Sequence, residues 1–283
     1  MATDSAFQTA YRQEFVEAFE QGVSLLRETC TTEAVIKGNQ AIFLVAGSGS
    51  ATATTRGING RITARADANT QNTCTLAEWH DLVRKTGFNI FASQGNQRAM
   101  MQMTTVKTVN RKIDSLIETE LATGSVGIGA TGTIPNISLI MNGVVKLQNA
   151  SVPWDNNITF LCQPSFLAYL MQTTEWASAD FVNLKPYANQ DANWRDAPSA
   201  YRWNNMLVIS HPNLSGKGTT AEKSYMYHKA AIGHAMDTAG MQTFADYDAE
   251  QDYSWSRATG YMGAKLLQNA GVVVVTHDGS AYA

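Results

Sequence analysis

Hydrophobic residues recur at steps of three and four over residues 4–28, which is the spacing of one face of an α-helix. The opposite face carries four glutamates. The apolar positions are Phe7, Tyr11, Phe15, Phe19, Val23 and Leu26, and the acidic ones are Glu14, Glu17, Glu20 and Glu28. We therefore predict an amphipathic, acidic helix over 4–28, either docked on its own core or packed under a neighbouring chain.

The pattern changes over residues 38–77, where large apolar side chains become sparse and Gly, Thr, Ala and Asn dominate. A short apolar strand is predicted at 41–46, and Asn59-Gly60, between Ile58 and Ile62, is typical of a tight turn. So few large apolar side chains cannot form a core of their own. We predict a projecting hairpin that neighbouring chains hold in place, with a flexible exposed loop as the alternative.

The helical period returns over residues 96–122, which form the longest predicted helix, and Gly124 is a natural stop beyond it. At 1.5 Å per residue this helix would be about 40 Å long. A methionine-rich stripe at this spacing indicates core packing rather than a cofactor site. The stripe consists of Met100, Met103, Val106, Val109, Ile113, Leu116, Ile117 and Leu121.

The remaining chain mixes helix and strand patterns without an internal repeat. Residues 76–85 are predicted to be a short helix or an edge strand, and the glycine-rich segment 124–132 a loop. Other predicted elements are strands at 158–162, 205–210 and 224–234, a helix that opens at Pro164, and a hairpin of residues 260–267 and 272–276. The fold class is therefore predicted to be α+β.

Length, composition and charge limit the classes of function that this chain can have. The 283 residues suit one large domain or two coupled subdomains, and only 16% are charged, as expected of a surface covered largely by partners. The net charge of −3, with no Lys/Arg-rich run, argues against a nucleic-acid reader. Charge is uneven: residues 1–35 hold six acidic residues and two arginines, a net of −4, whereas 38–77 has a net of +2.

The cysteines and the first residues of the chain show no pattern of a disulfide framework, a metal site or a targeting signal. Cys30, Cys74 and Cys162 form no C-x-x-C pair, so we predict reduced structural thiols rather than disulfides or a zinc site. The first residues have neither the basic nor the apolar region of a signal peptide, and no apolar run approaches the roughly 18–20 residues that span a bilayer. We expect a protein made in a cytoplasm, without a membrane partner.

No motif predicts an active site. The glycines of 124–132 and 215–219 lack phosphate-loop spacing, the five histidines form no H-E-x-x-H motif, and no G-x-S-x-G elbow occurs. We therefore predict no catalytic, cofactor-binding or metal-binding residue, and a protein that is not an enzyme.

One acidic run is spaced like calcium ligands: Asp246, Asp248, Glu250 and Asp252. A calcium-binding loop that starts at Asp246 would need Gly at 251 and Glu at 257, where this chain has glutamine and arginine. An acidic surface loop is predicted, with a weak divalent-ion site as the alternative.

Several stretches, in this order, resemble coat sequences of tailed bacteriophages. They are TLAEWHDLVRKTGFNIFASQ, MMQMTTVKTVNRKIDSLIETELATG, PSFLAYLMQT, NMLVISHPNL and YMGAKLLQNAGVVVVTHDG. Together with the order of arm, extended hairpin, long helix, mixed region and closing strands, they make nearly the whole chain similar to a major capsid protein of the Hong Kong 97 fold.

The resemblance implies a domain layout. Residues 1–37 would be the N-terminal arm, 38–77 the extended loop (E-loop), 78–130 and 256–283 the peripheral domain with its spine helix at 96–122, and 131–255 the axial domain.

The resemblance also implies a function. The chain would be a structural protein of the virion, made in the host cytoplasm, that self-assembles as pentamers and hexamers into an icosahedral shell around packaged double-stranded DNA. Expected partners are other copies, a portal protein, a separate scaffolding or decoration protein, and DNA by loose, non-specific contact. Residues 38–77 contain no Lys and no Glu, so the shell is expected to lack the covalent cross-link of the family's prototype.

Opposite charge on the arm and the hairpin predicts that these segments of different subunits attract each other. The predicted intersubunit contacts are Arg56, Arg61 and Arg65 on the hairpin, and Glu14, Glu17, Glu20, Phe15 and Phe19 on the arm. Two alternatives stay open at this point: an encapsulin, which is a cellular shell of the same fold, and a soluble hydrolase-like enzyme.

Overall fold

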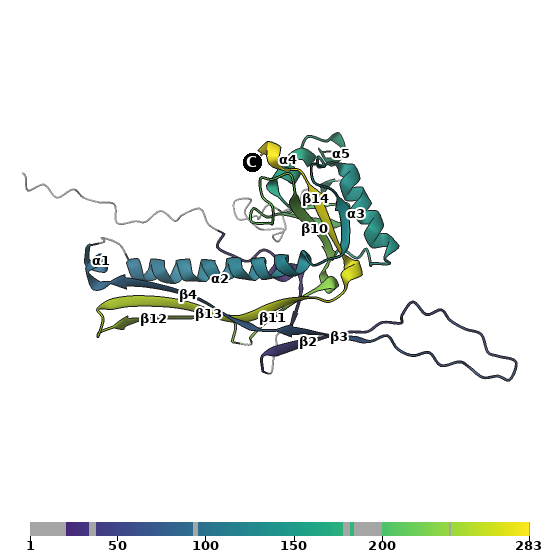
Figure 1. Cartoon of the computed structure of the whole chain (residues 1–283), viewed down its shortest axis with the longest axis horizontal. Coiled ribbons are helices and arrows are strands. Elements are labelled where there is room, and N and C mark those ends of the chain that lie inside the picture. The colour runs from purple at the N-terminus through teal and green to yellow at the C-terminus, as the bar shows by residue number, and fades with distance from the viewer. Residues whose placement is uncertain are drawn as a thin grey trace, which may run out of the picture.

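Two sheets, one long helix and a projecting two-stranded ribbon make up the computed structural model of the chain (Figure 1). The structure describes residues 21–33, 38–92, 96–177, 182–183, 200–237 and 239–282. The predicted α+β class is confirmed within these residues. No helix among them combines the length and the apolar character needed to cross a membrane.

The first sheet has five strands, and its centre is the 14-residue strand β13. β13 pairs antiparallel with β4 on one side, and with β12 and then β11 on the other, while β1 joins β11 in parallel. The strands are β1 (Thr31–Glu33), β4 (Ala77–Thr86), β11 (Ile232–Met236), β12 (Gln242–Asp248) and β13 (Tyr253–Leu266). The segment predicted as a short helix or edge strand at 76–85 is therefore a strand.

Helix α2 (Gln97–Leu121) lies along this sheet and confirms the predicted spine helix at 96–122 (Figure 1). Asn96 caps its start, because its side chain accepts a hydrogen bond from the backbone N–H of Ala99 at 3.2 Å. A short helix, α1 (Gly87–Ala92), precedes it at the end of β4.

The predicted hydrophobic stripe of α2 is wrong in the first half of the helix. Met101, Thr105 and Val109 are buried, whereas Met103 is exposed. Thr105 can occupy the buried face because its hydroxyl donates to the backbone oxygen of Gln102 at 2.8 Å, which satisfies its polar group locally. A prediction that counts only apolar residues as buried misses such a threonine.

The second sheet has seven strands in the order β5-β14-β10-β6-β9-β8-β7. Their bounds are β5 (Val126–Gly129), β6 (Ile158–Cys162), β7 (Val182–Asn183), β8 (Ala200–Trp203), β9 (Met206–Ser210), β10 (Glu222–His228) and β14 (Val272–His277). Helices α3 (Ile137–Asn149), α4 (Pro164–Leu170) and α5 (Thr174–Ala177) accompany this sheet. The predicted strands at 158–162 and 205–210 and the helix at Pro164 are confirmed.

Both faces of the central strands of this sheet are buried. Tyr225 and Tyr227 of β10 pack in a cluster with the α2 residues Ile113 and Ile117. Met226 points to the other face, where it packs in a cluster with residues of α3. The run Val272–Val275 divides between the two clusters in the same alternating way, which explains why these strands show continuous apolar sequence rather than alternation.

Two predicted connections are wrong. Residues 224–234 do not form one strand: β10 ends at His228, a 3-10 turn follows at Lys229–Ala231, and β11 then belongs to the other sheet. Residues 260–276 do not form a hairpin either, because β13 and β14 lie in different sheets on either side of a 3-10 turn at Asn269–Gly271. Each turn carries the chain from one sheet to the other, and two adjacent apolar strands give no sequence signal for that change.

The glycine-rich segment 124–132 is not wholly a loop, since it contains β5, which pairs in parallel with β14. The predicted domain boundaries also do not coincide with the sheets. The range 131–255 includes β11 and β12 of the five-stranded sheet, and 256–283 ends with β14 of the seven-stranded one. A last 3-10 turn, Ser280–Tyr282, follows β14.

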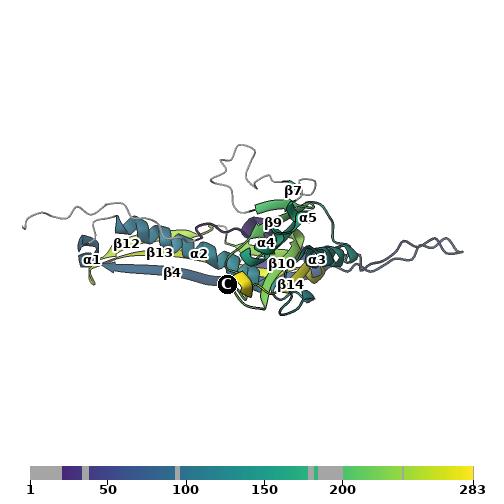
Figure 2. The same ribbon diagram turned by 90° about the horizontal axis from the view of Figure 1, so that it is seen from above.

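The ribbon consists of β2 (Gln40–Val45) and β3 (Thr70–Thr75), an antiparallel pair that confirms the strand predicted at 41–46. Beyond it, residues 46–69 extend away from both sheets (Figures 1 and 2). The predicted turn at Asn59-Gly60 forms the tip: Gly60 N donates to Gly57 O at 2.8 Å, and Gly60 has a φ of +67°, which favours glycine.

The packing of α2 generates a first prediction. Ile117 is fully buried between α2 and the sheets, so Ile117→Ala should lower the free energy of unfolding of the dissociated subunit by about 2–5 kcal/mol in urea titrations. Thr119→Ala, an exposed position on the same helix, should change it by less than about 0.5 kcal/mol. Equal effects of the two substitutions would contradict this packing.

Candidate intersubunit surface

The root of the E-loop is fixed on the five-stranded sheet by a small apolar cluster. Ala41, Phe43 and Cys74 of the ribbon pack with Ala235 of β11. The ring of Phe43 lies directly over Gly233, where a Cβ atom would be only 2.9 Å from the ring. Gly233 therefore permits this close approach, and the ribbon leaves the sheet from a rigid base.

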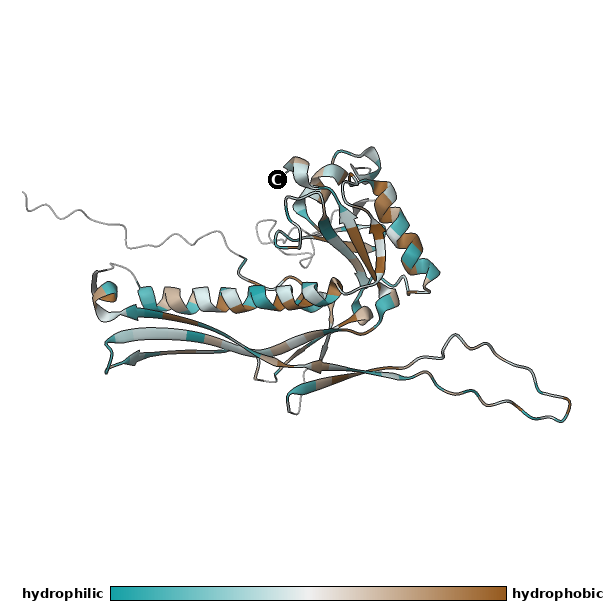
Figure 3. Ribbon diagram, viewed as in Figure 1, coloured by the Kyte–Doolittle hydropathy of each residue, from teal (hydrophilic) through white to brown (hydrophobic). Residues whose placement is uncertain are grey.

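The opposite side of the E-loop exposes apolar side chains. Ile42 and Leu44 alternate with the buried positions of β2, and Leu44 is 79% exposed. Ile58 at the tip is fully exposed and Ile62 is 65% exposed. In Figure 3 hydrophobic colour continues from the ribbon into the projecting loop, which lies apart from both sheets. Isoleucines carried on an extended loop indicate a contact surface for another chain.

The three arginines predicted as contacts lie on this loop but differ in their surroundings. Arg65 is held locally, since its Nη1 donates to Ser48 O at 3.2 Å and its Nη2 lies 3.6 Å from Asp67 Oδ1. Arg56 and Arg61 flank the tip, and neither side chain has a hydrogen-bond or ion-pair partner within the described part of the chain. Their charges are therefore available to another molecule.

The predicted arm contacts Glu14, Glu17, Glu20, Phe15 and Phe19 lie outside the described residues, so the arm–loop attraction stays a prediction. The described end of the predicted helix 4–28 is not α-helical: residues 21–26 are irregular, and Arg27–Thr29 is a 3-10 turn. Residues 21–26 are not helical because the spine helix binds their side-chain and backbone donors at an anchor residue.

Asp114 of α2 is that anchor. Its buried carboxylate accepts hydrogen bonds from Gln21 Nε2, from Ser24 Oγ at 2.5 Å, and from the backbone N–H groups of Leu25 and Leu26 at 3.1 and 3.2 Å. His211 Nε2 lies 3.2 Å from the same carboxylate. The two backbone donors cannot also serve a helix, so the chain turns here, and Leu26 enters the core.

Burial on its own would raise the pKa of Asp114, but the hydrogen bonds from His211, Ser24, Leu25 and Leu26 outweigh it and hold that pKa below its ordinary value. The carboxylate is thus charged at neutral pH. β1 follows the anchor and pairs in parallel with β11.

A second buried network resembles a catalytic triad. Ser224 Oγ lies 2.8 Å from His277 Nε2, and His277 Nδ1 lies 3.6 Å from Glu222 Oε2. The carboxylate of Glu222 also accepts from Ser165 Oγ and from Gly218 N. Ser224 and His277 are completely buried, so a substrate cannot reach the hydroxyl. Ser165, at the start of α4, and the loop at Gly218 are thereby tied to β10 and β14, which is a structural role.

Cys30, Cys74 and Cys162 are free and buried, as predicted. Burial raises the pKa of Cys30 and of Cys162 to about 12, and that of Cys74 to about 11. Because the thiolate is the reactive form, these thiols are unreactive at neutral pH.

The acidic run lies in the β12–β13 hairpin. Asp246 and Asp248 belong to β12, while Glu250 and Asp252 lie in the turn. Asp248 Oδ1 accepts from the backbone N–H groups of Glu250 and Gln251, and Asp252 Oδ1 from Tyr247 Oη at 2.6 Å. No group of three or more metal-ligating side chains occurs among the described residues. These carboxylates stabilise a surface turn.

Substitution of Asp114 tests the anchor. Asp114→Asn replaces one carboxylate oxygen by an amide NH2 group, which donates hydrogen bonds and therefore cannot accept them from the surrounding donors. It should lower the free energy of unfolding by about 3 kcal/mol. It should also speed proteolysis near residues 21–30. The exposed Asp246→Asn is the matched control and should behave as the unmodified chain. Unchanged stability and cleavage in Asp114→Asn would refute the anchor.

Buried His234 of β11 predicts a dependence of stability on pH. Burial, with a smaller effect of Arg27, lowers its pKa to about 4, and Nε2 has no partner among the described residues. The unfolded chain takes up this proton below about pH 6.5. Stability should therefore fall as pH falls from 6.5 to 4, with about 1.4 kcal/mol per pH unit for this proton.

Denaturant titrations of dissociated subunits across this range measure the slope. His277, whose pKa burial also lowers to about 4, adds a second proton of the same sign. His234→Leu should remove one proton's share of the slope. A slope unaffected by His234→Leu would show that this histidine is not held neutral.

Comparison with known proteins agrees with this architecture. The family model described as phage capsid protein matches residues 3–279. No curated protein sequence matches the chain. A solved structure from Mycobacterium phage Che8 superposes with a TM-score of 0.73 at 15% identity, covering 97% of this chain and 98% of that one.

Two further structures show the same fold at low identity. The capsid of Ralstonia phage GP4 has a TM-score of 0.69 and 10% identity, covering 98% of this chain and 96% of its own. The head of Helicobacter pylori bacteriophage KHP40 has a TM-score of 0.71 and 9% identity, with the same coverage. Together with the family match along almost the whole chain, this fold shows that the chain belongs to the phage capsid protein family: it is a major capsid protein of the Hong Kong 97 fold, a structural component of the virion shell.

Proposed function

We propose that this chain is the repeating subunit of an icosahedral shell of pentamers and hexamers that encloses packaged double-stranded DNA. The observation that carries the proposal is the E-loop, which extends beyond β2 and β3 with Ile58 and Ile62 in solvent (Figure 2). A protein that stays monomeric gains no stability from apolar side chains exposed to water. Covering the loop with a neighbour removes those side chains from water.

The expected strength of this contact is modest per subunit. Burying one isoleucine stabilises by about 1.5–3 kcal/mol, so the tip contributes a few kcal/mol to each interface. A shell repeats the interface in every copy and closes by symmetry, so modest contacts add up to a stable particle. Residues 38–77 hold neither lysine nor glutamate, which supports a shell held without covalent cross-links.

Charge supports loose rather than tight contact with DNA. The chain has a net charge of −3, and nonspecific DNA binding requires several Lys or Arg side chains on the phosphates. An inner wall that does not bind DNA tightly lets the packaged DNA move while the shell is filled and emptied. A portal protein, a separate scaffolding or decoration protein and synthesis in the host cytoplasm complete the proposal as partners and setting.

The alternatives are less well supported. Encapsulins share the fold, but the matching family is that of phage capsid proteins. A hydrolase would need an accessible nucleophile, and the nearest arrangement, Ser224 with His277, is closed to solvent. We infer that the protein acts by assembly and not by catalysis.

Sedimentation and electron microscopy of the purified protein test the proposal. The protein should form closed cages of uniform size, and the doubly substituted Ile58→Ser, Ile62→Ser variant should assemble at least tenfold less at equal concentration while its subunits stay folded. Thr54→Ser, at an exposed position of the same loop, is the control. A stable 30.8 kDa monomer that never forms cages would overturn the proposal.

Charge reversal at the tip gives a second prediction. Arg61→Glu should slow assembly, followed by light scattering, because opposite charges on two subunits speed encounter more than they add affinity. The rate of the unmodified chain should fall with added salt, and that of the variant should depend less on salt. Identical rates and salt dependence would show that Arg61 faces no acidic surface.

A further inference from the structure

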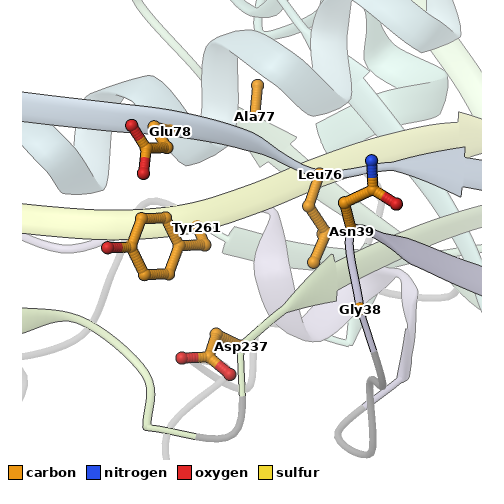
Figure 4. Close-up of a pocket in the computed structure, with 7 residues that line it drawn as sticks. All are labelled: Gly38, Asn39, Leu76, Ala77, Glu78, Asp237 and Tyr261. Atoms are coloured by element: carbon orange, nitrogen blue, oxygen red, sulfur yellow. The ribbon is translucent and has the colours of Figure 1, made fainter.

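We propose that a cavity at the root of the E-loop is the binding site for Arg61 from the E-loop tip of a second copy of this chain. The cavity has a volume of about 300 Å³ and is lined by Gly38, Asn39, Leu76, Ala77, Glu78, Asp237 and Tyr261 (Figure 4). We call it the root cavity. The inference rests on the proposed assembly and adds to it which surface receives the loop.

Three elements hold the root cavity in a fixed shape. Glu78 of β4 and Tyr261 of β13 are direct cross-strand partners in the five-stranded sheet. The N–H of Asp237 donates to Tyr261 O at 3.0 Å, which holds the end of β11 against β13. Leu76 N donates to Asn39 O at 2.8 Å, which closes the side formed by the ribbon. The site is therefore preformed and requires little ordering on binding.

The lining suits a long side chain with a charged end. Leu76 and Ala77 offer an apolar wall for an aliphatic stem, and Tyr261, which is partly exposed, offers the face of its ring. Figure 4 shows the side chains of Glu78 and Asp237 on either side of Tyr261. A guanidinium group stacks on aromatic rings and pairs with carboxylates, so an arginine fits the ring of Tyr261 and the carboxylate of Glu78.

The surroundings of Glu78 agree with an incoming cation. Glu78 Oε2 lies 3.6 Å from His80 Nε2, an exposed contact that leaves most of the carboxylate in solvent. The described residues supply no third metal-ligating side chain here, so a divalent ion would find at most two protein side chains as ligands. The chemistry of the cavity therefore favours an organic cation over a metal ion.

The tip of the E-loop supplies that cation. The side chain of Arg61 has no partner within the described part of the chain, and its backbone oxygen accepts a hydrogen bond from Gly57 N at 3.1 Å in the tip turn. Ile62 lies beside it with an exposed apolar side chain that can cover Leu76 and Ala77. In this structure the extended loop holds the tip away from its own root (Figure 1). A second copy must provide the arginine.

Reversal and restoration of charge test the pairing. Glu78→Lys and Arg61→Glu should each reduce cage formation at least tenfold, and the double variant should recover at least half of it. Glu175→Lys, at an exposed site in α5, is the control and should assemble normally. Folding of each subunit is checked by thermal unfolding, so a misfolded variant is not read as an assembly defect.

Other restorations would overturn the pairing. If Arg61→Glu is rescued by Glu17→Lys and not by Glu78→Lys, the arm is the partner of Arg61. If Glu78→Lys is rescued only by Arg56→Glu, the occupant is a different cation. Normal assembly of Glu78→Lys would also refute the proposal. The unmodified chain tests the proposed function separately. If it forms no cages, the proposed function is wrong, whereas failure of the pairing alone would leave cages of the unmodified chain intact.

Disulfide trapping gives a second readout that does not depend on assembly yield. The native thiols are buried and unreactive, so Glu78→Cys with Arg61→Cys can be oxidised in an otherwise silent background. Particles or concentrated subunits should give a ladder of covalent oligomers under nonreducing electrophoresis. Glu78→Cys with Arg65→Cys is the matched control and should give at least fivefold less. Equal ladders, or none with the first pair, would contradict the proposal.

Discussion

Residues 46–69 have no core of their own, and this constraint shapes the rest of the molecule. The loop combines small polar residues with a few isoleucines, and it extends into solvent because its own chain offers nothing to pack against. An extended loop can act as a connector only if its base is rigid. Phe43 over Gly233 and the β2–β3 pairing provide that base.

The rigid platform comes from α2 and the strands packed on it. One face of the seven-stranded sheet and one face of the five-stranded sheet share a core with α2, so the two sheets form a continuous body. Asp114 ties the segment at residues 21–26 to the middle of the same helix. Both the loop root and the segment at residues 21–26 are therefore held by one framework.

The sequence predicted those elements whose signals are local. The spine helix follows from its period and its asparagine cap, the helix at Pro164 from proline at a first-turn position, and the tip of the E-loop from Asn59-Gly60. These features depend on residues that are close together in the chain.

The features that were missed depend on distant residues. Strands buried on both faces, such as β10 and β14, show no alternation, so the pattern could not assign β10 and β11 to different sheets. The end of the arm is irregular because Asp114, far along the chain, takes its backbone donors. The root cavity unites Glu78 of β4, Tyr261 of β13 and Asp237, which directly follows β11, a juxtaposition that no spacing in the sequence indicates.

Amide hydrogen exchange of residues 46–69, compared between free subunits and assembled particles, tests the central claim most directly. The E-loop should exchange rapidly in the subunit, and at least tenfold more slowly in the particle because a neighbour covers it. Equally rapid exchange in both forms would show that the loop stays in solvent and that the shell is held by other contacts.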